Sequence, residues 1–275
     1  MSNSNNVLSF EQALKALNSL SETTLAKECW VPSCKTHIKL KEINAEQQKK
    51  LLSSTLEKTL VAEKIHFEQF IYQVLKQNNL SEALNINNLT VLDRSVLALA
   101  LRHQVSSHID VRFFDSNQKE YTEKIDLGPL VEKIKNYEHP EQEEVVFDKS
   151  SLDVRIIVDI PKLGLDNFYY ENTPFLKNNK DTSNEKILND MIVEGFILET
   201  SKYIKNILLD GQDLSYLSWN LNQKTFFIEK LPVFIVQNIF EKIASWKSSL
   251  DSYFKVQSSL GDEAILDINS MSFLS

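Results

Sequence analysis

Apolar residues recur at helical spacing near the start of the chain. Ser9 and Gln12 form a capping-box pattern, and the apolar residues that follow lie on one face of a helix over residues 9–20. Asn44 and Gln47 repeat this pattern and begin a second helix that runs to about residue 61. The sequence therefore predicts two amphipathic helices with well-defined first turns.

The same spacing predicts further helices along the chain. One helix is expected over residues 64–77, and Thr90 caps another that is apolar on more than one side. A helix of that kind belongs inside the fold. Helical spacing resumes over residues 187–208, where Gly211 marks the stop. Two more helices begin at Asn222 and Pro232.

Other stretches alternate between apolar and polar residues, as strands do. A turn within residues 29–41 predicts a hairpin, and a second hairpin is expected over residues 108–125. Residues 152–160 are the clearest strand, with residues 145–147 as its neighbour. We expect the second hairpin and these strands to form one antiparallel sheet with one face in water.

These elements predict an α+β protein that is predominantly α-helical, with a small antiparallel β-sheet in the middle of the chain. Three regions are expected. Residues 1–107 form an N-terminal helical region with the hairpin at 29–41, residues 108–177 form the small sheet region, and residues 178–275 form a C-terminal helical region with an apolar tail.

Composition and charge narrow the class of function. Hydrophobic residues make up 42% of the chain, which is typical of a globular protein and excludes wholesale disorder. The net charge of -8 makes nucleic acid an unfavourable partner. The polar N-terminus does not resemble a secretory signal, and no apolar run approaches the roughly 20 residues of a membrane span. We therefore expect no membrane partner.

Little in the sequence points to chemistry. The glycines are too far apart for a dinucleotide or phosphate-binding loop, so we expect no cofactor and no small-molecule substrate. The two cysteines, Cys29 and Cys34, are expected to be reduced, and without a second pair they predict no metal site. The nearest approach to a ligand cluster is His103, His108 and Asp110, which a helix C-terminus explains better.

Three stretches carry a resemblance to a known family. They are Trp30-Val31-Pro32-Ser33, then Gln47-Gln48-Lys49 within residues 39–52, and then Asp93-Arg94 followed by Leu101-Arg102. Together they cover roughly residues 25–105 and resemble the baseplate-hub assembly proteins of T-even-type contractile-tailed bacteriophages. The resemblance implies a non-enzymatic structural or assembly role in the tail baseplate, without catalytic residues or cofactor.

The resemblance also sets the expected partners, which are other baseplate-hub or tape-measure proteins. Contact would come from the hairpin turn, the first helix and the apolar tail. Trp30 in the turn fits an interface anchor and a core residue equally well. The candidate partner-binding residues are Trp30, Val31, Pro32, Ser33, Ile268, Met271, Phe273 and Leu274.

Two other hypotheses stay open. The first is a transient assembly chaperone for hub or tape-measure proteins that is absent from the mature particle. The second is an enzyme centred on His103, His108 and Asp110. The expected location is the host cytoplasm during assembly, and the tail baseplate if the protein is retained.

Overall fold

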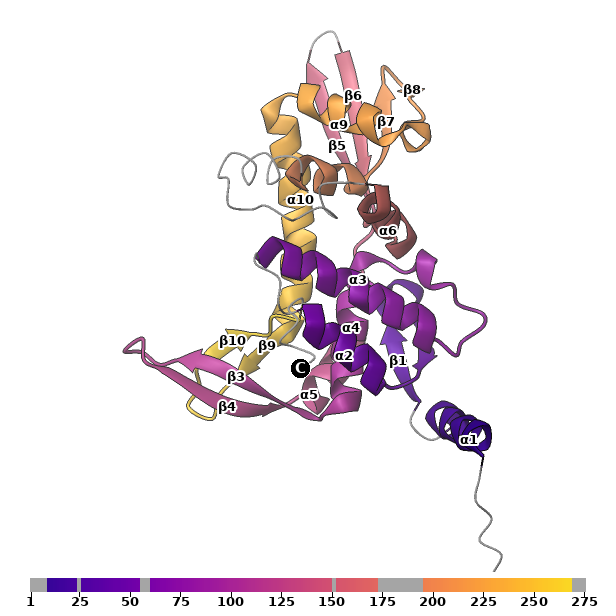
Figure 1. Cartoon of the computed structure of the whole chain (residues 1–275). Helices are drawn as coiled ribbons and strands as arrows, with labels where there is room; N and C mark the ends of the chain where they lie inside the picture. Colours follow the sequence, from indigo (N-terminus) through magenta and orange to yellow (C-terminus); the bar gives the residue numbers. More distant parts are fainter. Residues whose placement is uncertain (1–8, 24–25, 55–59, 150–151, 173–194, 269–275) are drawn as a thin grey trace, which may run out of the picture.

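Long helices form the middle of the molecule, and small sheets lie at its ends. The structure is a computed structural model and describes residues 9–23, 26–54, 60–149, 152–172 and 195–268. In Figure 1 the long helix α10 runs from a four-stranded sheet at the top to two β-ribbons near the bottom, while α1 projects from the lower end.

The predicted capping boxes are present. Ser9 and Gln12 exchange hydrogen bonds at the start of α1, as do Asn44 and Gln47 before α2, and Thr90 caps α4. Residues 195–203 are also helical. The other described helices are α1 (Phe10–Thr23), α2 (Ala45–Ser54), α3 (Leu60–Asn78), α4 (Val91–Val105), α5 (Gly128–Lys133), α6 (Leu163–Asn172), α9 (Leu221–Lys230) and α10 (Val233–Asp251).

The strands of the described residues form four separate antiparallel sheets, β1–β2, β3–β4, β5–β6–β7–β8 and β9–β10. They are β1 (Lys27–Val31), β2 (Thr36–Leu40), β3 (His108–Phe114), β4 (Glu120–Asp126), β5 (Glu143–Lys149), β6 (Leu152–Val158), β7 (Ile204–Leu209), β8 (Gln212–Asp213), β9 (Lys255–Gln257) and β10 (Glu263–Ile265).

The predicted fold class, a predominantly helical chain with one small sheet in its middle, is therefore wrong. Sheets are spread along the chain, and the β3–β4 hairpin does not join β5 and β6. It lies instead beside β9–β10, where the Tyr121 hydroxyl hydrogen bonds to the Asp262 carboxylate at 2.5 Å. Alternation identified β1 to β6 but not β7 to β10, and it carries no information about which strands pair.

Residues 204–209 form strand β7, although the spacing predicted the end of a helix. A bulge in the β6–β7 ladder pairs Val158 with Ile204 but Ile157 with Asn206, so one residue is left over. The buried residues Ile204 and Ile207 are consequently three apart, a spacing that imitates a helix. Gly211 does not stop a helix; it has φ +77° in the turn between β7 and β8.

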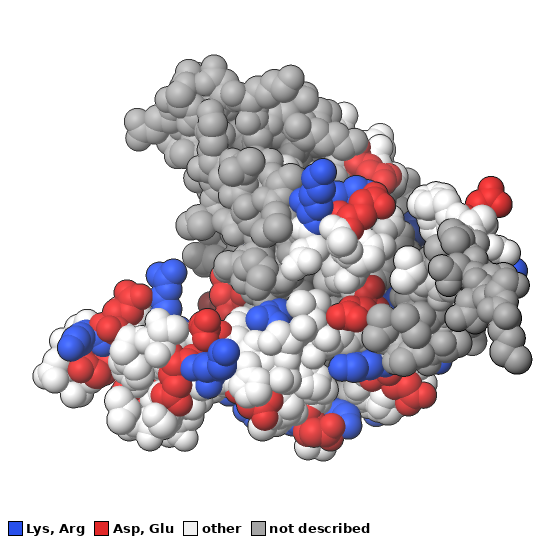
Figure 2. Space-filling view, turned by 60° about the horizontal axis from the view of Figure 1, so that its bottom comes forward, with Lys and Arg blue, Asp and Glu red and all other residues white. Residues whose placement is uncertain are grey.

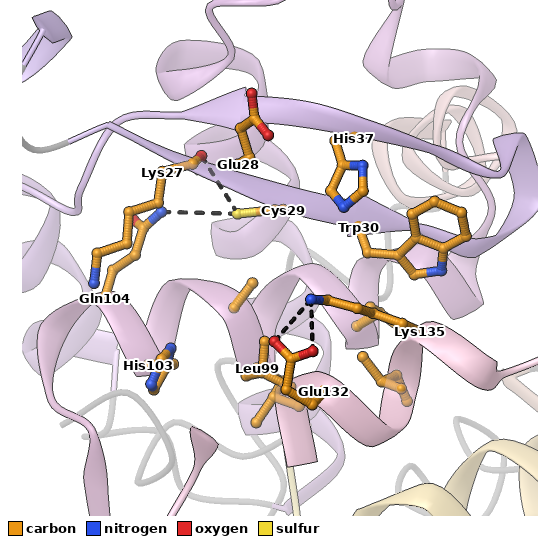
Figure 3. Close-up of a pocket in the computed structure, with 14 residues that line it drawn as sticks. Lys27, Glu28, Cys29, Trp30, His37, Leu99, His103, Gln104, Glu132 and Lys135 are labelled. Atoms are coloured by element: carbon orange, nitrogen blue, oxygen red, sulfur yellow. Dashed lines mark hydrogen bonds and ion pairs between the residues drawn. The ribbon is translucent and has the colours of Figure 1, made fainter. Parts of the chain in front are cut away.

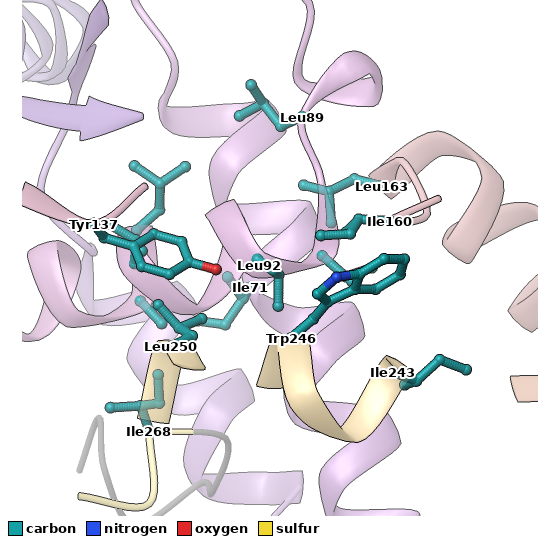
Figure 4. Close-up of a cluster of buried hydrophobic side chains, with 14 of the residues drawn as sticks. Ile71, Leu89, Leu92, Tyr137, Ile160, Leu163, Ile243, Trp246, Leu250 and Ile268 are labelled. Carbon is teal, nitrogen blue, oxygen red and sulfur yellow. The ribbon is translucent and has the colours of Figure 1, made fainter. Parts of the chain in front are cut away.

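One hydrophobic core connects the helices with the sheets. Figure 4 shows Trp246 and Leu250 of α10 against Leu92 of α4 and Ile71 of α3, with Ile268 beside them. This buried cluster draws residues from all three of the regions expected from the sequence. The helix that Thr90 caps lies inside the fold as predicted, since nearly every residue from Val91 to Leu101 is buried.

Candidate partner-binding site

The β1–β2 hairpin forms one side of the candidate site. Its inner face, made by Cys29, Val31, Ile38 and Leu40, is buried against the core. On the opposite face the Trp30 ring packs edge-on to His37, with ring centroids 5.0 Å apart. Antiparallel pairing places Trp30 opposite His37, so the hairpin register itself brings these two side chains together.

A buried carboxylate anchors the hairpin turn. Asp93, at the start of α4, accepts hydrogen bonds from the Ser33 backbone N–H at 3.0 Å and from the Ser33 hydroxyl at 2.5 Å. It also accepts from the Thr90 N–H at 2.7 Å and the Thr90 hydroxyl at 2.9 Å. Two of the stretches that carry the family resemblance therefore meet, and they fix the hairpin on the first turn of α4.

A cleft of about 290 Å³ lies beside the hairpin. Helix α4 contacts both β1 and α5 and so forms the floor, while β1 and the α5 region face each other as walls (Figure 3). The lining includes apolar side chains from the floor and the α5 wall, namely Val96, Leu99, Ala100, Val131 and Ile134. Polar side chains, among them Lys27, His37, His103 and Gln104, surround this apolar centre.

Two residues that line the cleft each contain a buried polar atom without a partner in the described part of the chain. These atoms are the Trp30 indole Nε1, a donor, and the Gln104 carbonyl Oε1, an acceptor. The Gln104 amide nitrogen makes only long contacts, 3.5 Å to the Leu40 carbonyl and 3.7 Å to Cys29 Sγ. A buried polar group without a partner costs about 1–3 kcal/mol, so the packing around the cleft carries an energetic penalty at both atoms.

The groups in the cleft are poor reagents at neutral pH. Burial raises the pKa of the Cys29 thiol to about 12, despite the nearby cation Lys27. Burial, followed by the charge of Lys27, lowers the pKa of His103, so its imidazole is mainly neutral. Lys135 pairs with Glu132 at 2.7 Å. This environment suits apolar and hydrogen-bonding contacts.

The structure places the predicted contact residues in different surroundings. Val31, Pro32 and Ile268 are buried in the chain itself, and Ser33 is bound to Asp93. Trp30 is half-buried at the cleft. Met271, Phe273 and Leu274 lie outside the described residues.

The three residues of the enzyme hypothesis are not joined by hydrogen bonds. His103 lines the cleft. His108 is exposed at the start of β3, and its Nδ1 lies 2.8 Å from the Ser107 hydroxyl. Asp110 is exposed on β3. Within the described ranges no group of three or more His, Cys, Asp or Glu residues could hold a metal ion.

Helix α1 offers a second surface. Its apolar stripe is largely in solvent, with Phe10 79%, Leu14 42% and Leu17 65% exposed. These residues are spaced at i, i+4 and i+7, which places them on one face. A surface stripe of this kind, on a helix that projects from the body, is typical of a protein contact site.

A largely buried ionic cluster that joins α3, α4 and α6 has no signal in the sequence. Arg94 contacts Asp166 of α6 at 2.5 Å and Glu68 of α3 at 3.0 Å. Lys202 contacts Asp166 and Glu199, both at 2.5 Å. Burial alone would raise the pKa of Asp166, but Lys202 and Arg94 outweigh it and lower that pKa. Lys247 of α10 contacts Glu199 at 3.2 Å, so three basic side chains balance three acidic ones in a cluster that joins helices distant in sequence.

The charged surface has no single sign on the face that Figure 2 shows, where acidic and basic side chains are interspersed. Charge alone therefore selects no partner at this face. Among the described helices, none combines the length and hydrophobicity that a bilayer crossing requires. Comparison of the chain with protein-family models, with curated proteins and with solved structures finds no match.

Proposed function

We propose that this protein is a non-enzymatic component or assembly factor of a bacteriophage tail baseplate hub and acts through protein–protein contacts. The resemblance of residues 25–105 to baseplate-hub assembly proteins supports a role in the tail baseplate. The observation that carries the contact role is the apolar stripe of α1, whose Phe10 is 79% exposed. The proposed partners are other hub or tape-measure proteins, met in the host cytoplasm during assembly.

The chemistry of α1 favours a protein surface as its target. Amphipathic helices that lie on membranes carry many Lys and Arg on the polar face, but α1 has one Lys, Lys15, beside the acidic residues Glu11 and Glu22. A helix of 14 residues is also marginally stable alone in water. Burying the stripe in an apolar groove of a partner would stabilise both the helix and the complex.

Two double variants test this role. Leu14→Asp with Leu17→Asp places two charges in the stripe, whereas Ala16→Asp with Ser19→Asp places the same charges on the other side of the helix. Burial of a Leu side chain contributes about 1.5–3 kcal/mol, so the stripe variant should weaken binding about a hundredfold or more.

The measurement is co-purification of the full chain with co-expressed hub and tape-measure proteins. The stripe variant should lose these proteins and the control variant should retain them. Equal retention by both variants, or no association of the wild-type chain, would reject the proposal. Mass spectrometry of purified particles then separates the roles, since a fixed copy number indicates a structural part and absence indicates a chaperone.

A further inference from the structure

The outer edge of β1 has backbone groups that pair with nothing in the described residues. Lys39 of β2 donates its N–H to the Ser81 hydroxyl and accepts from the Leu80 N–H, both at 2.8 Å, so its backbone groups point away from β1. Glu28 lies opposite Lys39. In an antiparallel pair, residues whose backbone groups point toward the partner strand alternate with residues whose backbone groups point away from it. Glu28 and Trp30 lie two residues apart, so both present their N–H and C=O on the free edge of β1.

This free edge borders the cleft. Glu28 and Trp30 both line it, with α4 beneath and the α5 region opposite. Trp30 and Gln104, whose buried indole N–H and side-chain carbonyl have no partner in the described residues, belong to the same lining. One side of the cleft thus carries alternating backbone donors and acceptors.

We propose that an extended segment of a partner protein adds to β1 as a third strand and places an apolar side chain in the cleft. The inference deepens the proposed function by naming a second contact, and it rests on that function for the identity of the partner. Glu28 and Trp30 are two residues apart on β1, a distance of about 7 Å, which matches the two-residue repeat of an extended backbone. Added strands gain affinity from such main-chain bonds and specificity from pockets for alternate side chains.

The dimensions and charges of the cleft define the segment further. A volume of about 290 Å³ lies at the small end of ligand pockets, which span about 300–1,000 Å³, and suits individual side chains. In Figure 3 the Lys27 side chain extends toward His103, while the Glu28 carboxylate points away from the cleft. No ion pair is found for Lys27 in the described ranges, so an acidic residue is expected at that end of the segment.

A proline substitution tests the edge directly. Glu28→Pro removes an outward N–H but leaves the β1–β2 ladder, because the Glu28 N–H is not part of that ladder. Glu28→Ala is the matched control, since it removes the same charge and keeps the N–H. The probe is a displayed library of short random peptides selected on the full chain, followed by synthesis of the enriched peptide.

The expected result is an enriched peptide with apolar residues at alternate positions. Its affinity should fall about tenfold or more for Glu28→Pro and stay within about threefold for Glu28→Ala, given the loss of one main-chain hydrogen bond and the steric block of the proline ring. With ¹⁵N-labelled tryptophan, the peptide should shift the Trp30 indole signal, which Trp30→Phe identifies.

A second pair of variants applies if Glu28→Pro does not fold. Ala100→Phe fills the floor of the cleft, whereas Ala244→Phe adds the same ring on an exposed position of α10. Only the first should weaken peptide binding. Circular dichroism establishes that each variant folds.

Several results would overturn the inference. They are failure to enrich any peptide, equal affinity for Glu28→Pro and Glu28→Ala, and a bound peptide that leaves the Trp30 indole signal unmoved. Self-association of the wild-type chain that Glu28→Pro abolishes would assign the edge to a second copy instead. The peptide arm uses no phage protein, so its failure is distinguishable from failure of α1 to bind hub proteins.

Discussion

Replacing Asp93 with Ala should destabilise the protein strongly, because this carboxylate is completely buried and accepts four hydrogen bonds. Two of the four donors are hydroxyl groups with alternatives. The Thr90 hydroxyl lies 3.0 Å from His139 Nε2, and the Ser33 hydroxyl is partly exposed to water. The cost therefore comes mainly from the two backbone N–H groups, those of Ser33 and Thr90.

The magnitude follows from the burial of these donors. A buried donor without a partner costs about 1–3 kcal/mol, and the Thr90 N–H belongs at the upper part of that range. The Ser33 N–H is only partly buried and belongs at the lower part. Asp93→Ala should thus lower the free energy of unfolding by about 3 kcal/mol, a large fraction of the 5–15 kcal/mol typical of a folded domain.

The assay is urea unfolding followed by circular dichroism and tryptophan fluorescence. Glu229→Ala, at an exposed position of α9, is the control and should stay within about 0.5 kcal/mol of wild type. A double-mutant cycle of Ser33→Ala with Asp93→Ala should show a coupling of about 1 kcal/mol. A loss below about 1 kcal/mol for Asp93→Ala would refute the anchoring role.

Two further predictions concern titration. Iodoacetamide near pH 8 should modify exposed Cys34 and spare Cys29 until urea unfolds the chain, because burial raises the pKa of Cys29 to about 12; equal rates by mass spectrometry would contradict this. In the ionic cluster, burial would raise the pKa values of Asp166 and Glu199, but Lys202 outweighs burial together with Arg94 at Asp166 and together with Lys247 at Glu199, and both pKa values lie below their ordinary values of 3.8 and 4.5. A carboxyl group with a lowered pKa in the folded state stabilises the folded state when the pH is above the ordinary pKa of that group. This stabilisation is lost progressively as the pH falls below about 4. Between pH 7 and pH 3, urea unfolding should therefore show a larger loss in the free energy of unfolding for wild type than for Lys202→Met. Equal losses would contradict the role of Lys202 in lowering these pKa values.

Local signals explain which parts of the fold the sequence could predict. A capping box involves two residues that are three apart in the sequence, so the sequence alone predicts those of Ser9 with Gln12 and of Asn44 with Gln47. Strand β7 was missed because its bulge spaces buried residues as a helix does. The turn offered a usable signal, since Asp-Gly is a strong hairpin marker and both Asp210 and Gly211 have positive φ.

The candidate site was predictable only where a single segment forms it. Trp30 stood out as a large aromatic residue next to a turn, and it does line the cleft. The floor and the opposite wall come from α4 and α5, whose approach to β1 depends on tertiary packing. The ionic cluster was missed for the same reason, because Asp166 and Lys202 are ordinary polar residues until the fold places them 2.5 Å apart.

Four residues of the stretches that suggested a phage family have structural roles at the β1–β2 hairpin. Pro32 and Val31 are buried, and Ser33 and Asp93 bind each other, so these positions hold the hairpin on α4. Holding the hairpin there leaves the outward N–H and C=O groups of Trp30 facing the cleft. A hydrogen-bonded anchor on one side and an unpaired edge on the other is the arrangement that an added strand requires, because an edge fixed in advance loses less conformational entropy on binding. Changes in the anchor should therefore affect stability first, whereas changes at the edge should affect partner binding with little effect on stability.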